Sequence, residues 1–121
     1  MTEIEALIAD LGKATGPNRQ LDLRISHALG YRRDQAAEVD ASAQAWLTPS
    51  GEKVASIPFF TRSLDNAYRL ASVAAPSDDW GCGWETGLAS AKLGDDMPCE
   101  ASTPAIALCM AALRRISLST I

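Results

Sequence analysis

The sequence has few of the residues from which metal and catalytic sites are usually built. It contains one histidine, His27, and three cysteines, with no Cys-x-x-Cys pair. A zinc site or a disulfide framework needs more of these residues at closer spacing, so neither is predicted. A phosphate-binding loop, a HExxH helix, a nucleophile elbow and a calcium-binding EF-hand loop are also missing. We therefore expect no metal and no cofactor.

Long apolar runs are missing as well. The longest, residues 104–113, has about half of the roughly 20 residues that a transmembrane helix needs, and two arginines follow it. The N-terminal segment MTEIEALIADLGK is acidic, unlike the basic start of a secretory signal. The composition, 47% hydrophobic and 21% charged, is typical of a globular domain. We expect a single domain over residues 1–121, cytoplasmic and reduced, without membrane contact.

Positive charge is scarce compared with negative charge. The net charge is −4, and residues 77–100, the acidic window, hold six carboxylates against Lys92 alone. These carboxylates are Asp78, Asp79, Glu85, Asp95, Asp96 and Glu100. Nucleic-acid binding needs a cationic surface and is therefore disfavoured. It would require four arginines to lie on one face: Arg32, Arg33, Arg114 and Arg115. The acidic window either serves solubility or attracts a cation or a basic partner surface.

Apolar residues at helical spacing predict four helices. Thr2 and Glu5 form a capping box before a helix over residues 3–11, which we expect Gly12 to end. The same spacing predicts a helix over residues 19–29. Ser63 is predicted to cap a third helix that ends before Pro76. A fourth helix is predicted to begin at Pro104, with Thr103 as its cap.

Two pairs of strands are predicted between these helices. Residues 45–48 and 53–57 form a predicted hairpin across a Pro-Ser-Gly turn, after a polar connection over residues 31–43. Residues 80–85 and 86–93 form the second pair. The predicted fold class is α+β, with one antiparallel sheet of about four strands covered by helices, an α/β/α sandwich.

The strand over residues 80–85 is the candidate binding surface. Trp80, Cys82 and Trp84 alternate with other residues and so share a face, and the flanking glycines indicate an exposed or closely approached strand. Tryptophan is enriched in interface hot spots, although both indoles would also fit beneath a helix. The candidate binding residues are Trp80, Trp84, Glu85, Asp78, Asp79, Asp95 and Asp96.

An enzyme is the alternative hypothesis. A small metal- or metabolite-dependent enzyme would assemble its site from Asp78, Glu85, Asp95 and His27. A cysteine nucleophile would need His27 to reach Cys82 or Cys99, since a base must generate the thiolate. The apolar surroundings of the cysteines favour a structural role. Both enzyme hypotheses depend on residues that are distant in the sequence.

Three blocks of sequence carry a family resemblance. They are Leu21-Asp22 through Ala28-Leu29-Gly30, residues 58–67 (PFFTRSLDNA) and residues 101–114 (ASTPAIALCMAALR). In this order they resemble small phage and prophage proteins with a phage ABA sandwich domain, except that Asn66 replaces an alanine and Ser102 precedes Thr103. The resemblance spans about residues 4–115 and implies a helix–sheet–helix sandwich with no known catalytic residues or ligands.

From these observations we expect a non-catalytic accessory protein of phage or prophage origin. It would act in the cytoplasm of a bacterial host by binding a protein, for example a component of the host or of its defence machinery. The missing catalytic motifs, the acidic window and the family resemblance support this expectation. A homodimer would be compatible with a small sandwich, but the sequence does not specify one.

Overall fold

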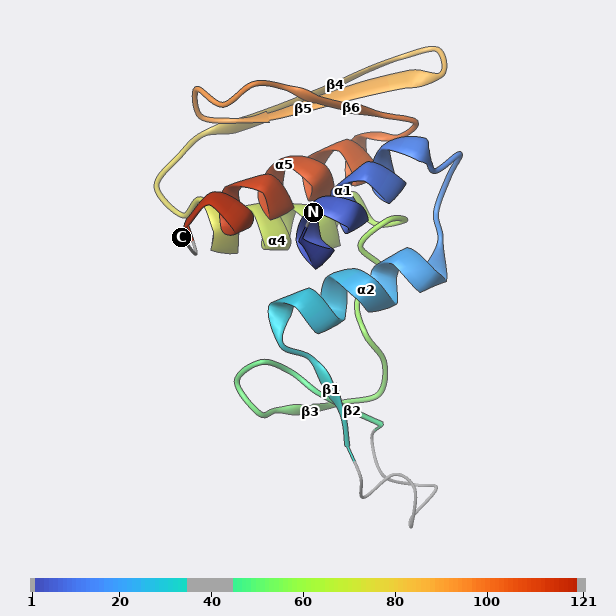
Figure 1. Cartoon of the computed structure of the whole chain (residues 1–121), viewed down its shortest axis with the longest axis vertical. Helices are drawn as coiled ribbons and strands as arrows, with labels where there is room; N and C mark the ends of the chain where they lie inside the picture. Colours follow the sequence, from blue (N-terminus) through green and yellow to red (C-terminus); the bar gives the residue numbers. More distant parts are fainter. Residues whose placement is uncertain (1, 35–44, 120–121) are drawn as a thin grey trace.

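The computed structural model describes residues 2–34 and 45–119, which contain four helices and six strands (Figure 1). The helices are α1 (Glu3–Lys13), α2 (Arg19–Leu29), α4 (Leu64–Ala74) and α5 (Pro104–Ser119). The strands are β1 (Arg32–Arg33), β2 (Trp46–Leu47), β3 (Lys53–Val54), β4 (Trp80–Glu85), β5 (Leu88–Leu93) and β6 (Cys99–Ala101). The predicted α+β class is confirmed.

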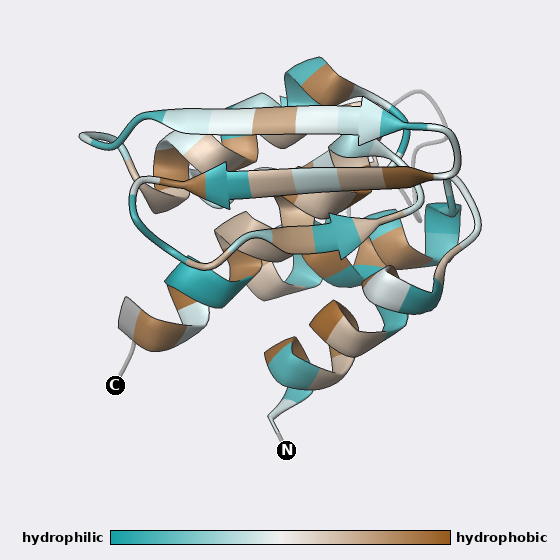
Figure 2. Ribbon diagram, turned by 90° about the horizontal axis from the view of Figure 1, so that it is seen from above, coloured by the Kyte–Doolittle hydropathy of each residue, from teal (hydrophilic) through white to brown (hydrophobic). Residues whose placement is uncertain are grey.

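The strands of the described residues form two separate antiparallel sheets. The larger sheet has the order β4-β5-β6, and the smaller has the order β1-β2-β3. Helices α1, α5 and α4 form a layer beneath the larger sheet, while the smaller sheet lies on the far side of this layer, beside α2 (Figure 1). Figure 2 shows the larger sheet from its outer face, with the described helices behind it.

The single sheet of about four strands, and with it the α/β/α sandwich, is therefore not confirmed. The predicted hairpin forms as β2 and β3, but it pairs with β1, and the helix layer separates it from β4 and β5. Strand β1 lies in the segment predicted to be a polar connection, of which residues 35–44 fall outside the described residues. β6 was not predicted.

The helices follow their predicted bounds closely, with one correction. Local caps explain the agreement: the Asn18 side chain caps α2, the Ser63 hydroxyl caps α4, and Gly30 ends α2 in the left-handed conformation. Gly12, however, does not end α1, which continues to Lys13. A Cβ at Gly12 would lie 3.3 Å from Met110 Cε, so glycine here permits α1 to approach α5.

Helix α5 is the centre of the core. Its residues from Ala105 to Leu113 are buried except Met110, which is half-buried. It packs against α1, α4, β5 and β6, and its many alanines let these elements approach closely. The sheet contributes one buried face to this core: Ala89, Ala91, Leu93, Cys99 and Ala101. A helix that is apolar on all sides is stable only when other elements surround it.

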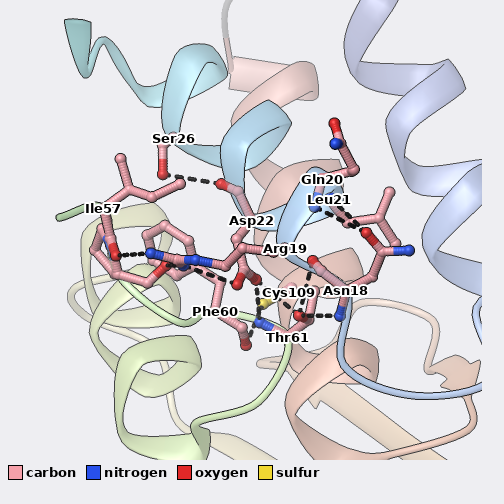
Figure 3. Close-up of polar contacts among 11 residues, drawn as sticks. Asn18, Arg19, Gln20, Leu21, Asp22, Ser26, Ile57, Phe60, Thr61 and Cys109 are labelled. Carbon is pink, nitrogen blue, oxygen red and sulfur yellow. Dashed lines mark hydrogen bonds and ion pairs between the residues drawn. The ribbon is translucent and has the colours of Figure 1, made fainter. Parts of the chain in front are cut away.

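A buried polar cluster joins α2 to the segment before α4 (Figure 3). Asp22 is only 2% exposed. Its Oδ1 accepts hydrogen bonds from the Thr61 amide at 2.8 Å and the Thr61 hydroxyl at 2.7 Å, and its Oδ2 lies 2.9 Å from Arg19 Nη1. The Asn18 amide donates to the Thr61 hydroxyl at 2.9 Å. Two of the blocks that carry the family resemblance therefore meet here.

We expect Thr61→Val to lower the free energy of unfolding by about 1–3 kcal/mol, because it removes the hydroxyl that donates to Asp22 Oδ1 and leaves the Asn18 amide without its acceptor. Urea denaturation of the purified protein measures this change. Ser72→Ala is the control: it removes an exposed hydroxyl that donates to the Tyr68 carbonyl, and should cost at most about 0.5 kcal/mol. Equal losses in the two variants would contradict a structural role for the cluster.

Candidate functional site

Strand β4 forms an exposed edge of the larger sheet. It spans residues 80–85 as predicted, and it pairs along its whole length with β5, from Trp80 opposite Leu93 to Glu85 opposite Leu88. Within the described residues no strand lies on its other side. All six of its residues are exposed. Its outer edge therefore presents backbone N–H and C=O groups that no strand of the described residues pairs.

The two indoles lie on the helix-facing side of the sheet but extend past the helices. Trp80 and Trp84 pair with Leu93 and Ala89, which are buried, and residues directly opposite each other share a face. Even so, Trp84 is 63% exposed and Trp80 36% exposed, because β4 is the outermost strand. Neither indole is enclosed beneath a helix, so β4 is an exposed strand, one of the two alternatives that the sequence left open.

Tyr68 of α4 completes this apolar surface. Its ring meets Trp80 edge to face, with the ring centroids 5.2 Å apart, and it stays 43% exposed. This contact fixes Trp80 while leaving Trp84 accessible. Sequence reasoning missed Tyr68, because nothing local to the sequence indicates which helix lies beneath the edge strand.

The outer face of β4 is nearly bare because of Gly81 and Gly83. A Cβ built on either glycine meets no atom within 4 Å, and neither has a positive φ. Packing and backbone conformation within the described residues therefore do not require glycine here, although glycine in a strand costs about 0.5–1 kcal/mol relative to alanine. The result is a shallow trough of about 470 Å³ whose lining also includes Ser90, Lys92 and Pro98.

Part of the acidic window is used within the fold. Arg115 of α5 pairs with Asp96 Oδ2 through its Nε at 2.9 Å and with Asp78 Oδ2 through its Nη1 at 2.6 Å. The hydrogen bond from Arg115 lowers the pKa of the Asp96 carboxyl, and the two carboxylates raise the pKa of Arg115. Asp78 and Asp96, predicted as binding residues, therefore hold the loops at one end of the sheet to α5.

The other carboxylates of the window face solvent. Asp79, Glu85, Asp95 and Glu100 are exposed, and none forms an ion pair with a described residue. Asp79 directly precedes β4 and Glu85 ends it, so a carboxylate lies at each end of the exposed strand. Lys92 on β5 is the only basic side chain of the window. The surface around β4 is thus anionic.

The residues of the enzyme hypothesis do not come together. Asp78 and Asp95 lie at one end of the larger sheet, and Glu85 lies at the other, roughly 20 Å away at the usual rise of a strand. His27 belongs to α2, on the far side of the helix layer, where its ring lies 6.1 Å from that of Trp46. Among the described residues, no group of three or more His, Cys, Asp or Glu side chains is arranged to hold a metal ion.

The four arginines considered for nucleic-acid binding do not share a face. Arg32 and Arg33 form β1 of the smaller sheet, whereas Arg114 and Arg115 belong to α5. Arg114 donates to the Met97 carbonyl, and Arg115 is held by Asp78 and Asp96. In the part of the chain that the structure describes, no helix has the length and apolar character to cross a membrane.

We expect Asp96→Asn to reduce stability at neutral pH and to weaken the acid sensitivity of the fold. Because Arg115 lowers the pKa of Asp96 in the folded state, the pair stabilises the fold above the ordinary value of 3.8, and this contribution is lost as the pH falls through the folded pKa. Urea unfolding measured between about pH 7 and pH 2 tests this. Asp95→Asn is the control, because Asp95 is exposed and forms no ion pair with a described residue. If the free energy of unfolding falls equally steeply with acid pH in Asp96→Asn and in the wild type, the assignment is contradicted.

The three thiols should differ sharply in reactivity. Cys82 is exposed, whereas burial raises the pKa of both Cys99 and Cys109. Since the thiolate is the nucleophile, we expect a maleimide at neutral pH to modify Cys82 alone, and the other two only after denaturation. Peptide mapping by mass spectrometry reads out the sites. Modification of all three at similar rates in the native protein would show that the core opens readily.

The surface around β4 combines an open strand edge, accessible aromatic side chains, and carboxylates that form no ion pair with a described residue. No protein-family model matches the chain, and neither a curated protein nor a solved structure matches it. The resemblance to phage ABA sandwich proteins therefore stays a prediction from the three sequence blocks.

Proposed function

We propose that this protein is a non-catalytic binding module whose β4 edge pairs with an extended segment of a partner protein. The observation that carries the proposal is the exposed Trp-Gly-Cys-Gly-Trp strand, whose glycines are required neither by packing nor by backbone conformation within the described residues. Glycine in a strand often marks a place where another backbone or a ligand approaches closely. An approaching partner would account for Gly81 and Gly83 despite their cost in stability.

Strand addition supplies both affinity and specificity at such an edge. The partner's backbone would bond to the free N–H and C=O groups of β4, as in other complexes formed by β-augmentation. Its side chains on one face would contact Trp84, and those on the opposite face would enter the trough over Gly81 and Gly83. Tryptophan contributes strongly at such contacts because it offers a large rigid surface.

The charges around β4 favour a basic partner segment. Asp79 and Glu85 lie at its two ends and are free of ion pairs with described residues. Lysine or arginine side chains at the matching positions of the partner would pair with these carboxylates. Such pairs would attract the partner as it approaches and fix the register of its strand against β4. These carboxylates are the part of the predicted acidic site that remains available.

The same charges disfavour a homodimer through this edge. In an antiparallel pairing of two copies with Trp80 opposite Trp84, Asp79 of one copy lies opposite Glu85 of the other. Like charges directly opposite each other destabilise a strand pair. Because this register is disfavoured, we propose that the partner is a different protein. The family resemblance adds the further proposal that it belongs to a bacterial host, for example to its defence machinery, and that the protein acts in the cytoplasm as a phage or prophage accessory protein.

Photocrosslinking from Cys82 tests the binding surface. A benzophenone maleimide attached to this thiol, followed by illumination in bacterial lysate, should label an extended, Lys- or Arg-containing segment that mass spectrometry identifies. We expect the double variant Gly81→Val, Gly83→Val to remain folded, because nothing occupies the space of its side chains, and to lose at least about tenfold in crosslinking or in affinity for the identified segment.

Gly16→Val is the matched control. A Cβ at Gly16 also meets nothing within 4 Å, but Gly16 lies in the loop between α1 and α2, away from β4. This variant should crosslink as the wild type does. Equal crosslinking by the β4 double variant would contradict the proposal, and a captured segment with net negative charge would overturn the choice of a basic partner.

A further inference from the structure

A second cavity, unrelated to β4, lies on the far side of the helix layer. It has a volume of about 440 Å³ and is bounded by the end of α2, the turn between β2 and β3, and α4. Its lining is mainly apolar: Leu29, Pro49, Pro58, Phe60, Leu70 and Val73. The volume of this cavity and its apolar lining are those of a small-molecule site. Such sites typically have volumes of about 300–1,000 Å³ and few polar groups.

One wall of the cavity is a turn that its own hydrogen bonds hold in place. The Thr48 amide donates to the Glu52 carbonyl at 2.8 Å, the Gly51 amide donates to the Thr48 carbonyl at 2.9 Å, and the Glu52 amide donates to the Thr48 hydroxyl at 3.1 Å. Gly30, with φ 104°, ends α2 next to Pro49, whose Cβ would lie 3.5 Å from a Cβ at Gly30. The turn is therefore held by its own hydrogen bonds and lies close to the end of α2.

The opposite wall and the floor are equally ordered. Phe60 and Leu70 are almost fully buried and form the floor. Arg19 donates to the carbonyls of Ile57 and Pro58, both at 2.8 Å, and so ties the segment before Phe60 to the Asp22 cluster. A cavity with preformed walls binds without a large ordering cost.

Polar groups line the cavity from both the turn and α4. The turn contributes Thr48, Ser50 and Glu52, and α4 contributes Asn66 and Arg69, which are three positions apart and line the same wall. Arg69 forms no ion pair or hydrogen bond with another described residue, and neither does the Asn66 side-chain amide. Tyr31 also lines the cavity, and burial raises the pKa of its hydroxyl, which stays neutral and able to donate at pH 7. The wall thus offers a guanidinium and further donors next to an apolar floor.

We infer that this cavity binds a small organic anion with an apolar body, of the class of medium-chain carboxylates. The hydrocarbon part lies against Phe60, Leu70 and Val73, and the carboxylate pairs with Arg69, whose planar guanidinium suits this group. Glu52 lines the same cavity and opposes an anion, so it limits the affinity. This inference does not depend on the proposed function of β4.

Titration with decanoate tests the inference, with 1-decanol as the uncharged probe. Decanoate should bind the wild-type protein in calorimetry and perturb amide resonances around residues 48–52 and 66–73. Arg69→Gln should weaken decanoate binding by about tenfold, since a charge-assisted hydrogen bond is lost, while leaving decanol binding unchanged. Glu52→Gln should strengthen decanoate binding.

Arg32→Gln is the matched control, because it removes the same charge from an exposed residue outside the cavity lining. It should bind decanoate as the wild type does. Equal binding of decanoate by Arg69→Gln and wild type would overturn the role of Arg69, and equal affinity of the wild type for decanol and decanoate would overturn the anionic class. Absence of any binding at millimolar decanoate would overturn the site itself.

Discussion

Burial of α5 on every side is the constraint on which the other layers depend. A helix made largely of alanine, leucine and isoleucine between Ala105 and Leu113 has no polar face to turn to water, so it needs neighbours all round. α1 and α4 flank it, and β5 and β6 cover it from above. Helix α5 packs against the inner face of the larger sheet, and the outermost strand β4 extends past the helices. The indoles of Trp80 and Trp84 therefore remain exposed.

The Asp22 cluster places the rest of the chain relative to this core. Through Thr61 and Arg19 it fixes the segment 57–61, from which Phe60 reaches the cavity floor and Ser63 begins α4. The Cys109 thiol of α5 donates to the Phe60 carbonyl at 3.4 Å, which links the cluster to the central helix. Both proposed sites use residues of α4, so both depend on the same buried hydrogen bonds.

Arg115 divides the acidic window into a structural and a free part. By pairing with Asp78 and Asp96 it secures the loops at one end of the sheet, and it leaves Asp79 and Glu85 without a counter-charge from the described residues. A cluster of carboxylates in the sequence thus becomes an anionic strand edge. The anion-binding cavity, with Arg69, lies on the opposite side of the helix layer, so the two sites differ in both place and charge preference.

Features that depend on neighbouring residues could be predicted from the sequence. The bounds of α2 and α4 follow from caps within three positions of each helix end, and the strand at Trp80–Glu85 follows from its alternation. Three features depend on how the chain folds in space: the division of the strands between two sheets, the ion pairs of Arg115 with Asp78 and Asp96, and the position of Arg69 at a cavity wall. These contacts join residues far apart in the chain, and their formation depends on how the layers pack around α5, which no local pattern encodes.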